Sequence, residues 1–228
     1  MAARDPEATK ARIFAAATAE FAAYGIAGAR IDRIAQAAQA NKQLIYAYFG
    51  DKAELFGHVL EQKLVEVAES VSMDIDDIDD WIERHIDYHT EHPELLRLLM
   101  WEALEFGDTG LAREAQRSER YQEKVTNFGK AQARGVLRSD VLPGHLLVLM
   151  LGLVNWPQAT RQIGGMIIGE DPRTSPDFRE SVKKCARSLA APQPGTETTP
   201  KTDTQADAQT GAQTEPQADP QPDTTPVP

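Results

Sequence analysis

The chain has 228 residues, of which 41% are hydrophobic and 26% are charged, and its formal net charge is −11. These values suit a globular protein made of one compact domain with an appendage, or of two small domains. Its one cysteine, Cys185, excludes an intrachain disulfide, and its longest apolar run, residues 146–154, is too short for a membrane-spanning helix.

Three short helices are predicted near the N-terminus. Apolar residues at helical spacing predict the first over residues 8–24, and Gly25 is the expected end. Apolar residues three and four positions apart predict a two-turn helix over residues 31–38. Asn41 is a good N-cap for a third helix, residues 42–48.

The second and third of these helices have the build of a helix-turn-helix. A tight turn separates them, and the outer face of the third is polar, aromatic and basic. In a helix-turn-helix, the second helix of the pair lies in the major groove of DNA. Ile45 and Phe49 are one helical turn apart and should point into the core. This leaves Lys42, Gln43 and Tyr46 on the outer face.

The rest of the chain is predicted to form a helical body. An amphipathic helix over residues 52–72 begins beside the motif and should connect it mechanically to this body. Further helices are expected over residues 81–91, 93–106 and 111–133, from Pro143 past Pro157, and over residues 177–189, with a loop at residues 164–176. The run at residues 146–154 is apolar all round, which predicts burial on both sides, one of them against a partner subunit.

Residues 191–228 differ in composition from the rest of the chain. They hold eight of the 14 prolines, nine threonines, six glutamines and one large aliphatic residue, Val227. A hydrophobic core cannot form from such a segment, so it is predicted to be a disordered acidic tail.

The N-terminal part resembles the TetR family of bacterial regulators over about residues 7–62. The parts that carry the resemblance are FAAYG at the end of the first helix, RIDRIAQAA in the second, and ANKQLIYAYFGDKAELF beyond the turn. The positions that match the family pattern are Asn41, Ile45, Tyr46, Tyr48, Phe49, Lys52 and Leu55.

Two positions depart from that family pattern. Gln39 stands where the turn normally carries glycine, and a non-glycine residue in a left-handed conformation there would cost roughly 1–2 kcal/mol. Arg30 stands where the second helix normally opens with threonine or serine. A cap is lost at Arg30, but a cation that could reach a phosphate is gained.

The resemblance implies an all-α homodimer with two domains. Residues 7–67 would form the DNA-binding domain, with its motif at about residues 30–49. Residues 68–190 would form a helical effector-binding and dimerisation domain, whose last two long helices pair across the dimer. This second domain matches the family in layout only, so the identity of its small-molecule effector does not carry over.

The expected contacts with double-stranded DNA come from the third helix and its flanks. Gln43 can pair with adenine and Lys42 with guanine, whereas the hydroxyl of Tyr46 should reach a phosphate. Leu44 could meet a thymine methyl group or pack partly into the core, and Tyr48 could contact DNA or pack. The full expected set is Arg30, Asn41, Lys42, Gln43, Leu44, Tyr46, Tyr48 and Lys52.

The charge distribution permits DNA binding in spite of the acidic total. Residues 1–56 hold seven Lys/Arg against six Asp/Glu, so the acidic surplus lies entirely in later residues. Phosphate binding depends on the contacts that are made locally. The acidic body should suppress non-specific DNA binding elsewhere on the protein.

The helical body contains no motif for a small-molecule or metal site as specific as the helix-turn-helix is for DNA. Aromatic and polar residues that could line an effector pocket are Tyr88, Trp101, Asn155 and Trp156, although core packing explains each equally well. His85 and His89 lie one helical turn apart, but a zinc site needs a third ligand, and His92 falls past the end of the helix. Residues 74–80, DIDDIDD, lack the spacing of a calcium loop. No metal or cofactor is expected.

The sequence therefore predicts a cytoplasmic, ligand-responsive repressor. It would bind a palindromic operator as a homodimer and be released by a small molecule. No phosphate loop, nucleophile elbow, HExxH or CxxC element points to an enzyme. The alternative is a helical dimer that binds a small molecule or a partner protein and no longer reads DNA.

Overall fold

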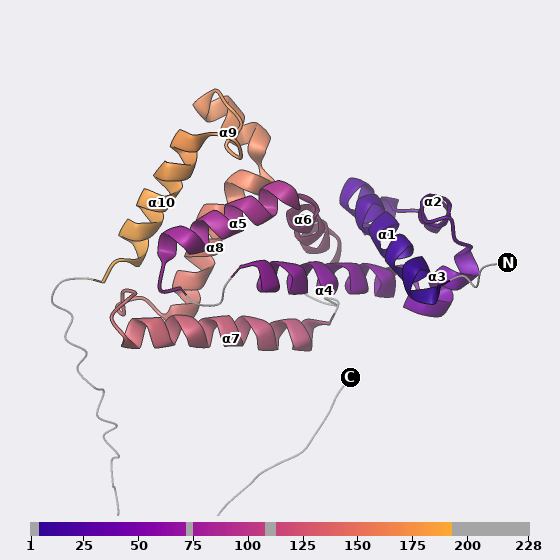
Figure 1. The fold of residues 1–228 in the computed structure, drawn as a ribbon, viewed down its shortest axis with the longest axis horizontal. Coiled ribbons are helices and arrows are strands. Elements are labelled where there is room, and N and C mark those ends of the chain that lie inside the picture. The colour runs from indigo at the N-terminus through magenta and orange to yellow at the C-terminus, as the bar shows by residue number, and fades with distance from the viewer. Residues whose placement is uncertain (1–4, 72–74, 108–112, 193–228) are drawn as a thin grey trace, which may run out of the picture. The chain divides into compact units, whose positions relative to one another are not determined.

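The computed structural model describes residues 5–71, 75–107 and 113–192, and all regular secondary structure in these ranges is helical. Its helices are α1 (Pro6–Gly28), α2 (Ile31–Ala37), α3 (Lys42–Phe49), α4 (Lys52–Ser70), α5 (Ile78–Glu91), α6 (Glu94–Phe106), α7 (Glu114–Ala133), α8 (Pro143–Ala159), α9 (Arg161–Ile168) and α10 (Pro176–Ala190) (Figure 1). No helix in the described ranges is long and apolar enough to span a bilayer. The predicted disordered tail lies outside the described residues except for its first two positions.

The all-α prediction is confirmed, but the predicted loop over residues 164–176 is wrong in its first part. Arg161–Ile168 forms the helix α9, although Gly164 and Gly165 lie inside it. Gly164 is needed there for close packing, because a Cβ atom would lie 2.7 Å from Cγ of Pro172. A glycine that reads as a loop signal in the sequence instead lets the following segment fold back onto α9.

Long-range ion pairs fasten α10 to α5 in the body. Arg179 Nη1 lies 2.6 Å from Asp87 Oδ1, and Lys183 Nζ lies 2.8 Å from Glu83 Oε1. The opposite side of α10 buries Val182 and Ala186 in the core. Because exposed ion pairs add little free energy, the apolar side holds α10 in place and the ion pairs set its register.

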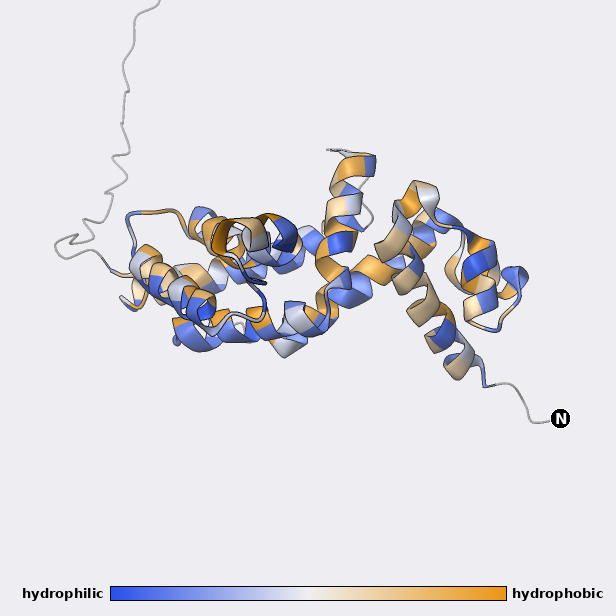
Figure 2. Ribbon diagram, turned by 90° about the horizontal axis from the view of Figure 1, so that it is seen from above, coloured by the Kyte–Doolittle hydropathy of each residue, from blue (hydrophilic) through white to orange (hydrophobic). Residues whose placement is uncertain are grey.

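The helix α8 is covered on one side only within the single chain. Leu146, Leu147, Met150 and Val154 are buried, whereas the exposed fractions are 68% for Val148, 52% for Leu149 and 62% for Trp156. Figure 2 shows that orange, apolar residues alternate with blue ones along most helices, as expected when each helix buries one side. The exposed residues on α8 form an apolar stripe of the kind that marks an interaction site.

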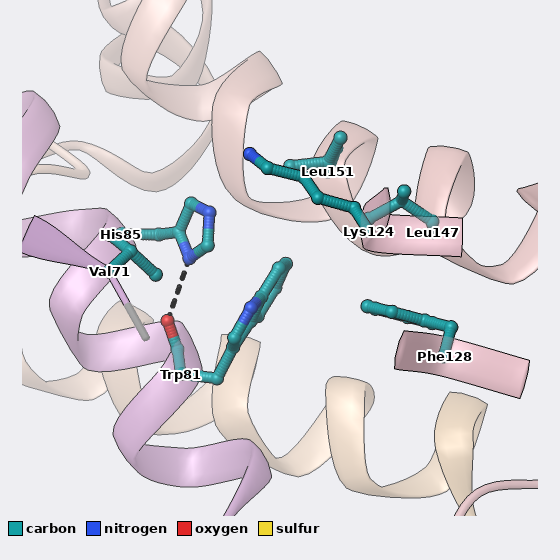
Figure 3. A pocket seen from close by; sticks show the side chains of 7 residues that line it. All are labelled: Val71, Trp81, His85, Lys124, Phe128, Leu147 and Leu151. Carbon is teal, nitrogen blue, oxygen red and sulfur yellow. Dashed lines mark hydrogen bonds between the residues drawn. The ribbon is translucent and has the colours of Figure 1, made fainter. Parts of the chain in front are cut away.

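The core of the body contains a small cavity beside a buried histidine (Figure 3). Trp81 and His85 of α5 face Lys124 and Phe128 of α7 across it. The free volume is about 20 Å³, room for little more than one water molecule. His85 hydrogen bonds to the carbonyl oxygen of Trp81 through Nδ1, at 2.8 Å, so Nδ1 carries the proton.

Burial in this region lowers the pKa of two histidines far below the ordinary value. The pKa of His85 falls to about 3 because burial disfavours its charged form. Burial likewise lowers the pKa of His89 to about 4. Both rings are therefore neutral in the folded protein at neutral pH. Within the described residues, no three His, Cys, Asp or Glu side chains converge as a metal site requires.

These pKa values predict a loss of stability in mild acid. Below about pH 6.5 the unfolded chain binds protons that the folded chain excludes, so the free energy of unfolding falls by roughly 1.4 kcal/mol per pH unit for each histidine. His85→Asn retains a donor for the Trp81 carbonyl and should flatten this decline between about pH 6.5 and pH 5. Urea unfolding followed by circular dichroism at several pH values measures the free energy of unfolding and its slope with pH. His145→Asn, at an exposed ring, is the control, and equal pH slopes in all three proteins would contradict the assignment.

Candidate nucleic-acid interface

The turn between α2 and α3 is held in one conformation by its backbone. Gln39 has a φ of 51°, in the left-handed region. Its N–H donates to the carbonyl of Gln36 at 3.2 Å, and the N–H of Ala40 donates to Ala35 at 3.0 Å. This is the Schellman pattern, which usually places glycine at the left-handed position. The left-handed conformation considered for Gln39 from the sequence is therefore kept, at a cost of roughly 1–2 kcal/mol.

Side chains of α1 fix both ends of α2. Arg12 Nε donates to the carbonyl of Ala38 at 3.1 Å, which holds the turn against α1. Glu20 Oε1 accepts from the N–H of Arg30 at 2.8 Å and from Nε of Arg33 at 2.7 Å. Burial alone would raise the pKa of Glu20, but the hydrogen bonds from Arg33 and Arg30 lower it below its usual range, so Glu20 is charged.

The helix α3 is anchored on one side and exposed on the other. Asn41 caps it, because its side chain accepts from the N–H of Leu44 at 2.8 Å. Ile45 is fully buried beneath it. The exposed residues on the outer face are Lys42, Gln43, Tyr46 and Ala47, and 49% of Tyr46 is accessible. Lys42 pairs with Asp32 of α2, so its ammonium group is already directed across the turn.

Two of the predicted DNA contacts lie at the rim of this face. Tyr48 is half-buried, and Nζ of Lys10 lies 5.4 Å from the centre of its ring. Lys52 is half-buried at the start of α4, where its Nζ donates to the carbonyls of Ala27 and Ala29, both at 3.3 Å. In this structure Lys52 therefore ties α4 to the end of α1. Its contact with a phosphate, like the other DNA contacts, stays a prediction.

The helix α1 is broken at Gly25, and α6 supplies the hydrogen bonds that the break removes. Gly25 has φ 68° and ψ −177°, so the carbonyl of Ala22 cannot accept from the N–H of Ile26 as in a regular helix. Instead, Arg97 Nε and Trp101 Nε1 donate to the Ala22 carbonyl, at 2.7 and 3.3 Å.

The freed N–H groups beyond the break are also bonded by α6. Glu105 accepts from Ile26 at 2.8 Å through Oε1 and from Ala27 at 2.7 Å through Oε2. These N–H groups open a new helical turn, where a negative charge is favourable. We call the contacts of Arg97, Trp101 and Glu105 with this break the α1–α6 junction. Among the described helices, α1 and α6 form the most extensive contact of any pair.

Only glycine fits at position 25. Its positive φ is unfavourable for other residues. In addition, a Cβ atom would lie 2.4 Å from Glu105 Oε1 and 2.8 Å from Cε3 of Trp101. The glycine that the sequence marks as a helix end is thus also a point of close approach between α1 and α6.

The residues predicted to line an effector pocket do not share one cavity in the described structure. Trp101 lies at the α1–α6 junction and also lines a surface groove. Tyr88 is buried and its hydroxyl donates to the carbonyl of Lys63 at 3.3 Å. Asn155 is half-buried on α8, and Trp156 belongs to the exposed stripe of that helix. Their role in ligand binding stays a prediction.

Two family models match the chain. The model for the N-terminal region of bacterial regulatory proteins of the tetR family matches residues 13–59, and the model for a tetracyclin repressor-like C-terminal domain matches residues 77–188. A curated protein, the HTH-type transcriptional repressor SCO4008 of Streptomyces coelicolor, is 53% identical over 189 residues, which are 83% of this chain and 98% of the relative. The chain belongs to the TetR family.

More distant relatives agree with this assignment. The HTH-type transcriptional repressor NicS of Pseudomonas putida is 27% identical over 70% of this chain and 80% of its own. Among solved structures, the regulator SCO4942 of Streptomyces coelicolor has a TM-score of 0.70 at 28% identity, over 80% of this chain and 98% of that chain. A TetR-family regulator of Marinobacter aquaeolei has a TM-score of 0.64 over 81% of this chain and 96% of its own, and at 16% identity it shows the fold alone.

Sequence reasoning missed the residues that support the TetR-type motif from behind. Arg12, Glu20 and Arg33 do not belong to the outer face, and no spacing rule connects them with the turn. Arg97 and Glu105 lie far along the chain from the break that they complete. The only local signal was Gly25 itself, which marks a break in α1 but does not say what covers it.

The carboxylate of Glu105 in the α1–α6 junction should have a measurable effect on stability and on amide hydrogen exchange. Glu105→Gln keeps the shape of the side chain but replaces one acceptor oxygen with an NH₂ group that cannot accept from a backbone N–H. Because Glu105 is partly exposed, we expect a loss of about 1 kcal/mol in stability and faster amide hydrogen exchange at Ile26 and Ala27. Glu91→Gln, at an exposed glutamate on α5, is the matched control. Unchanged exchange at both amides would show that Glu105 does not hold them.

Proposed function

We propose that this chain is a transcriptional repressor that acts in the cytoplasm and binds a palindromic operator as a homodimer. In this proposal residues 7–67 read DNA, and residues 68–190 dimerise and bind a small molecule that releases the operator. The helix α4 runs through the boundary between the two parts and joins them covalently (Figure 1). Membership of the TetR family and the names of the relatives SCO4008 and NicS support the proposal.

The observation that carries this proposal is the outer face of α3. Its inner side is fixed by Ile45 and by the cap at Asn41, while Lys42, Gln43 and Tyr46 remain exposed. A helix that is held rigidly and projects donors and an aromatic ring is suited to the major groove. Few exposed side chains need to be ordered when such a helix binds, which limits the entropic cost.

Each exposed residue has a distinct proposed role. Gln43 and Lys42 would contact base edges, with Lys42 exchanging its ion pair with Asp32 for DNA. Tyr46 would donate to a phosphate, and Leu44 would meet a thymine methyl group. Asn41, Arg30, Tyr48 and Lys52 flank these residues and would contact the DNA backbone.

The exposed apolar stripe of α8 supports the homodimer. Val148, Leu149 and Trp156 lie along one side of the helix and are largely exposed in the single chain. Covering them with the same surface of a second copy would remove apolar area from water. The dimer would then set the spacing of the two α3 helices, which must reach successive major grooves about 34–36 Å apart or a multiple of that distance.

Release by a small molecule requires that the ligand prefer a form that does not bind the operator. In the described structure the body contacts the DNA-reading helices through α4 and through the α1–α6 junction. A ligand that moves either helix would change the position of α3 in each subunit. We propose that the junction is the contact through which such a change passes.

Substitutions on α3 should separate affinity from base preference. Tyr46→Phe removes one phosphate hydrogen bond and should weaken binding about five- to tenfold on every operator variant. Gln43→Ala should mainly relax the preference at one base pair, by roughly 1–3 kcal/mol. Gel shifts with the region upstream of the chain's own gene, and with single-base variants of the bound site, measure both effects.

The gel-shift experiment has a control and two adverse outcomes. Lys130→Gln, on the exposed side of α7, should bind as the unmodified protein does, and sedimentation velocity on the same samples reports the oligomeric state. Identical losses from Tyr46→Phe and Gln43→Ala on all variants would refute the division of roles. No shift at low salt with folded dimeric protein would favour a helical dimer that no longer reads DNA.

A further inference from the structure

A surface groove between α6 and the α8–α9 segment adjoins the α1–α6 junction. It encloses about 400 Å³ and is lined by Pro93, Leu96, Arg97, Met100, Trp101, Leu104, Gln158, Ala159, Arg161, Gln162 and Arg173. This volume falls within the range of small-molecule sites. The cavity beside His85, in contrast, encloses only about 20 Å³.

The charged lining of the groove is basic, although the chain as a whole is acidic. It contains Arg97 of α6, Arg161 of α9 and Arg173, and no Asp or Glu. The nearby carboxylate of Asp171 is engaged by Arg173 at 2.7 Å and lies 4.0 Å from Arg161. Three guanidinium groups with one carboxylate behind them leave a net positive site, which is complementary to an anionic group.

The remaining lining is apolar apart from its amide groups. Leu96, Met100, Leu104 and the ring of Trp101 provide an apolar side on α6. Across from them Gln158 is 8% exposed, and its Oε1 has no hydrogen-bond partner in the described structure. A buried acceptor without a partner is costly, and a ligand N–H or O–H would satisfy it once the Gln158 side chain turned this oxygen toward the groove.

The groove borders the exposed stripe of α8. Gln158 and Ala159 line the groove, whereas Val148 and Trp156 belong to the stripe. Gln158 is two residues beyond Trp156, which places its side chain on nearly the opposite side of a helix with 3.6 residues per turn. Ala159 is three residues beyond Trp156 and therefore marks the border between the groove and the stripe.

Arg97 and Trp101 belong both to the groove and to the α1–α6 junction. Nε of Arg97 and Nε1 of Trp101 donate to the Ala22 carbonyl at the break in α1. An anion bound in the groove at the Nη groups of Arg97 would draw this guanidinium away from that carbonyl. Occupancy of the groove would thus weaken the hold of α6 on the DNA-reading helices.

We propose that this groove is the effector site, and that it takes an organic anion with an apolar ring system and one hydrogen-bond donor. The anionic group binds Arg161 and Arg97, the rings lie on Trp101 and Met100, and the donor meets Gln158. Binding loosens the α1–α6 junction. This inference rests on the proposed function only in naming the ligand an effector, because the binding and the loosening are both measured without DNA.

A matched pair of fluorescent probes tests the binding class. 8-Anilinonaphthalene-1-sulfonate carries an anion, aromatic rings and an N–H donor, and N-phenyl-1-naphthylamine is the same scaffold without the sulfonate. With the full chain, Arg161→Gln should weaken binding of the sulfonate roughly five- to tenfold and leave binding of the neutral probe unchanged. Lys130→Gln, at an exposed lysine of α7 outside the groove, should change neither. Unchanged sulfonate affinity in Arg161→Gln overturns the site.

Amide hydrogen exchange tests the link to α1. Saturating sulfonate probe should speed exchange at Ile26 and Ala27, and the neutral probe should not. In Arg97→Gln the sulfonate should no longer have this effect, because the shared guanidinium is gone. Slower or unchanged exchange in the unmodified protein would overturn the proposed loosening. Failure of the chain to bind any operator would instead refute the proposed function. Probe binding and amide exchange would still decide whether the groove binds an anion and loosens the α1–α6 junction.

Discussion

The break in α1 at Gly25 is the constraint on which the rest of the structure depends. A helix interrupted in this way leaves backbone carbonyl and N–H groups without their helical partners, and such groups are costly when they are not bonded. Here Arg97 and Trp101 of α6 bond the carbonyl of Ala22, and Glu105 bonds the N–H groups of Ile26 and Ala27. The N-terminal helices therefore obtain part of their own backbone hydrogen bonding from the body, and the position of α1 is tied to that of α6.

This arrangement explains how the short helix α3 is held by a body remote from it. Glu20 and Arg12 of α1 fix the ends of α2, the turn at Gln39 fixes α3 relative to α2, and α6 fixes α1. Each contact in this series is a hydrogen bond to backbone, so displacement at one step is passed on to the next. The groove that we propose as the effector site adjoins the first of these contacts.

The sequence predicted what depends on local chemistry. The cap at Asn41 was confirmed, because a cap is decided by residues a few positions away. The helix α9 was missed, because in the sequence Gly164 indicates a loop. In the structure this glycine lies inside the helix and allows close packing against Pro172, which the sequence alone does not show. The partners of Gly25 could not be predicted, since Glu105 lies 78 and 79 positions from the amides it binds. The DNA contacts themselves remain predictions, whereas the exposed face that carries them is present.

The most direct test measures whether α6 fixes the position of the N-terminal helices. In a Cys185→Ser background, a spin label at Gln36→Cys, exposed on α2, reports the distance between the two subunits of the proposed dimer by double electron–electron resonance. We expect a narrow distance distribution for this protein, broadened or displaced by Glu105→Gln and unaffected by Glu91→Gln. A distribution of the same position and width in all three would contradict the claim that the body positions α1 through this junction.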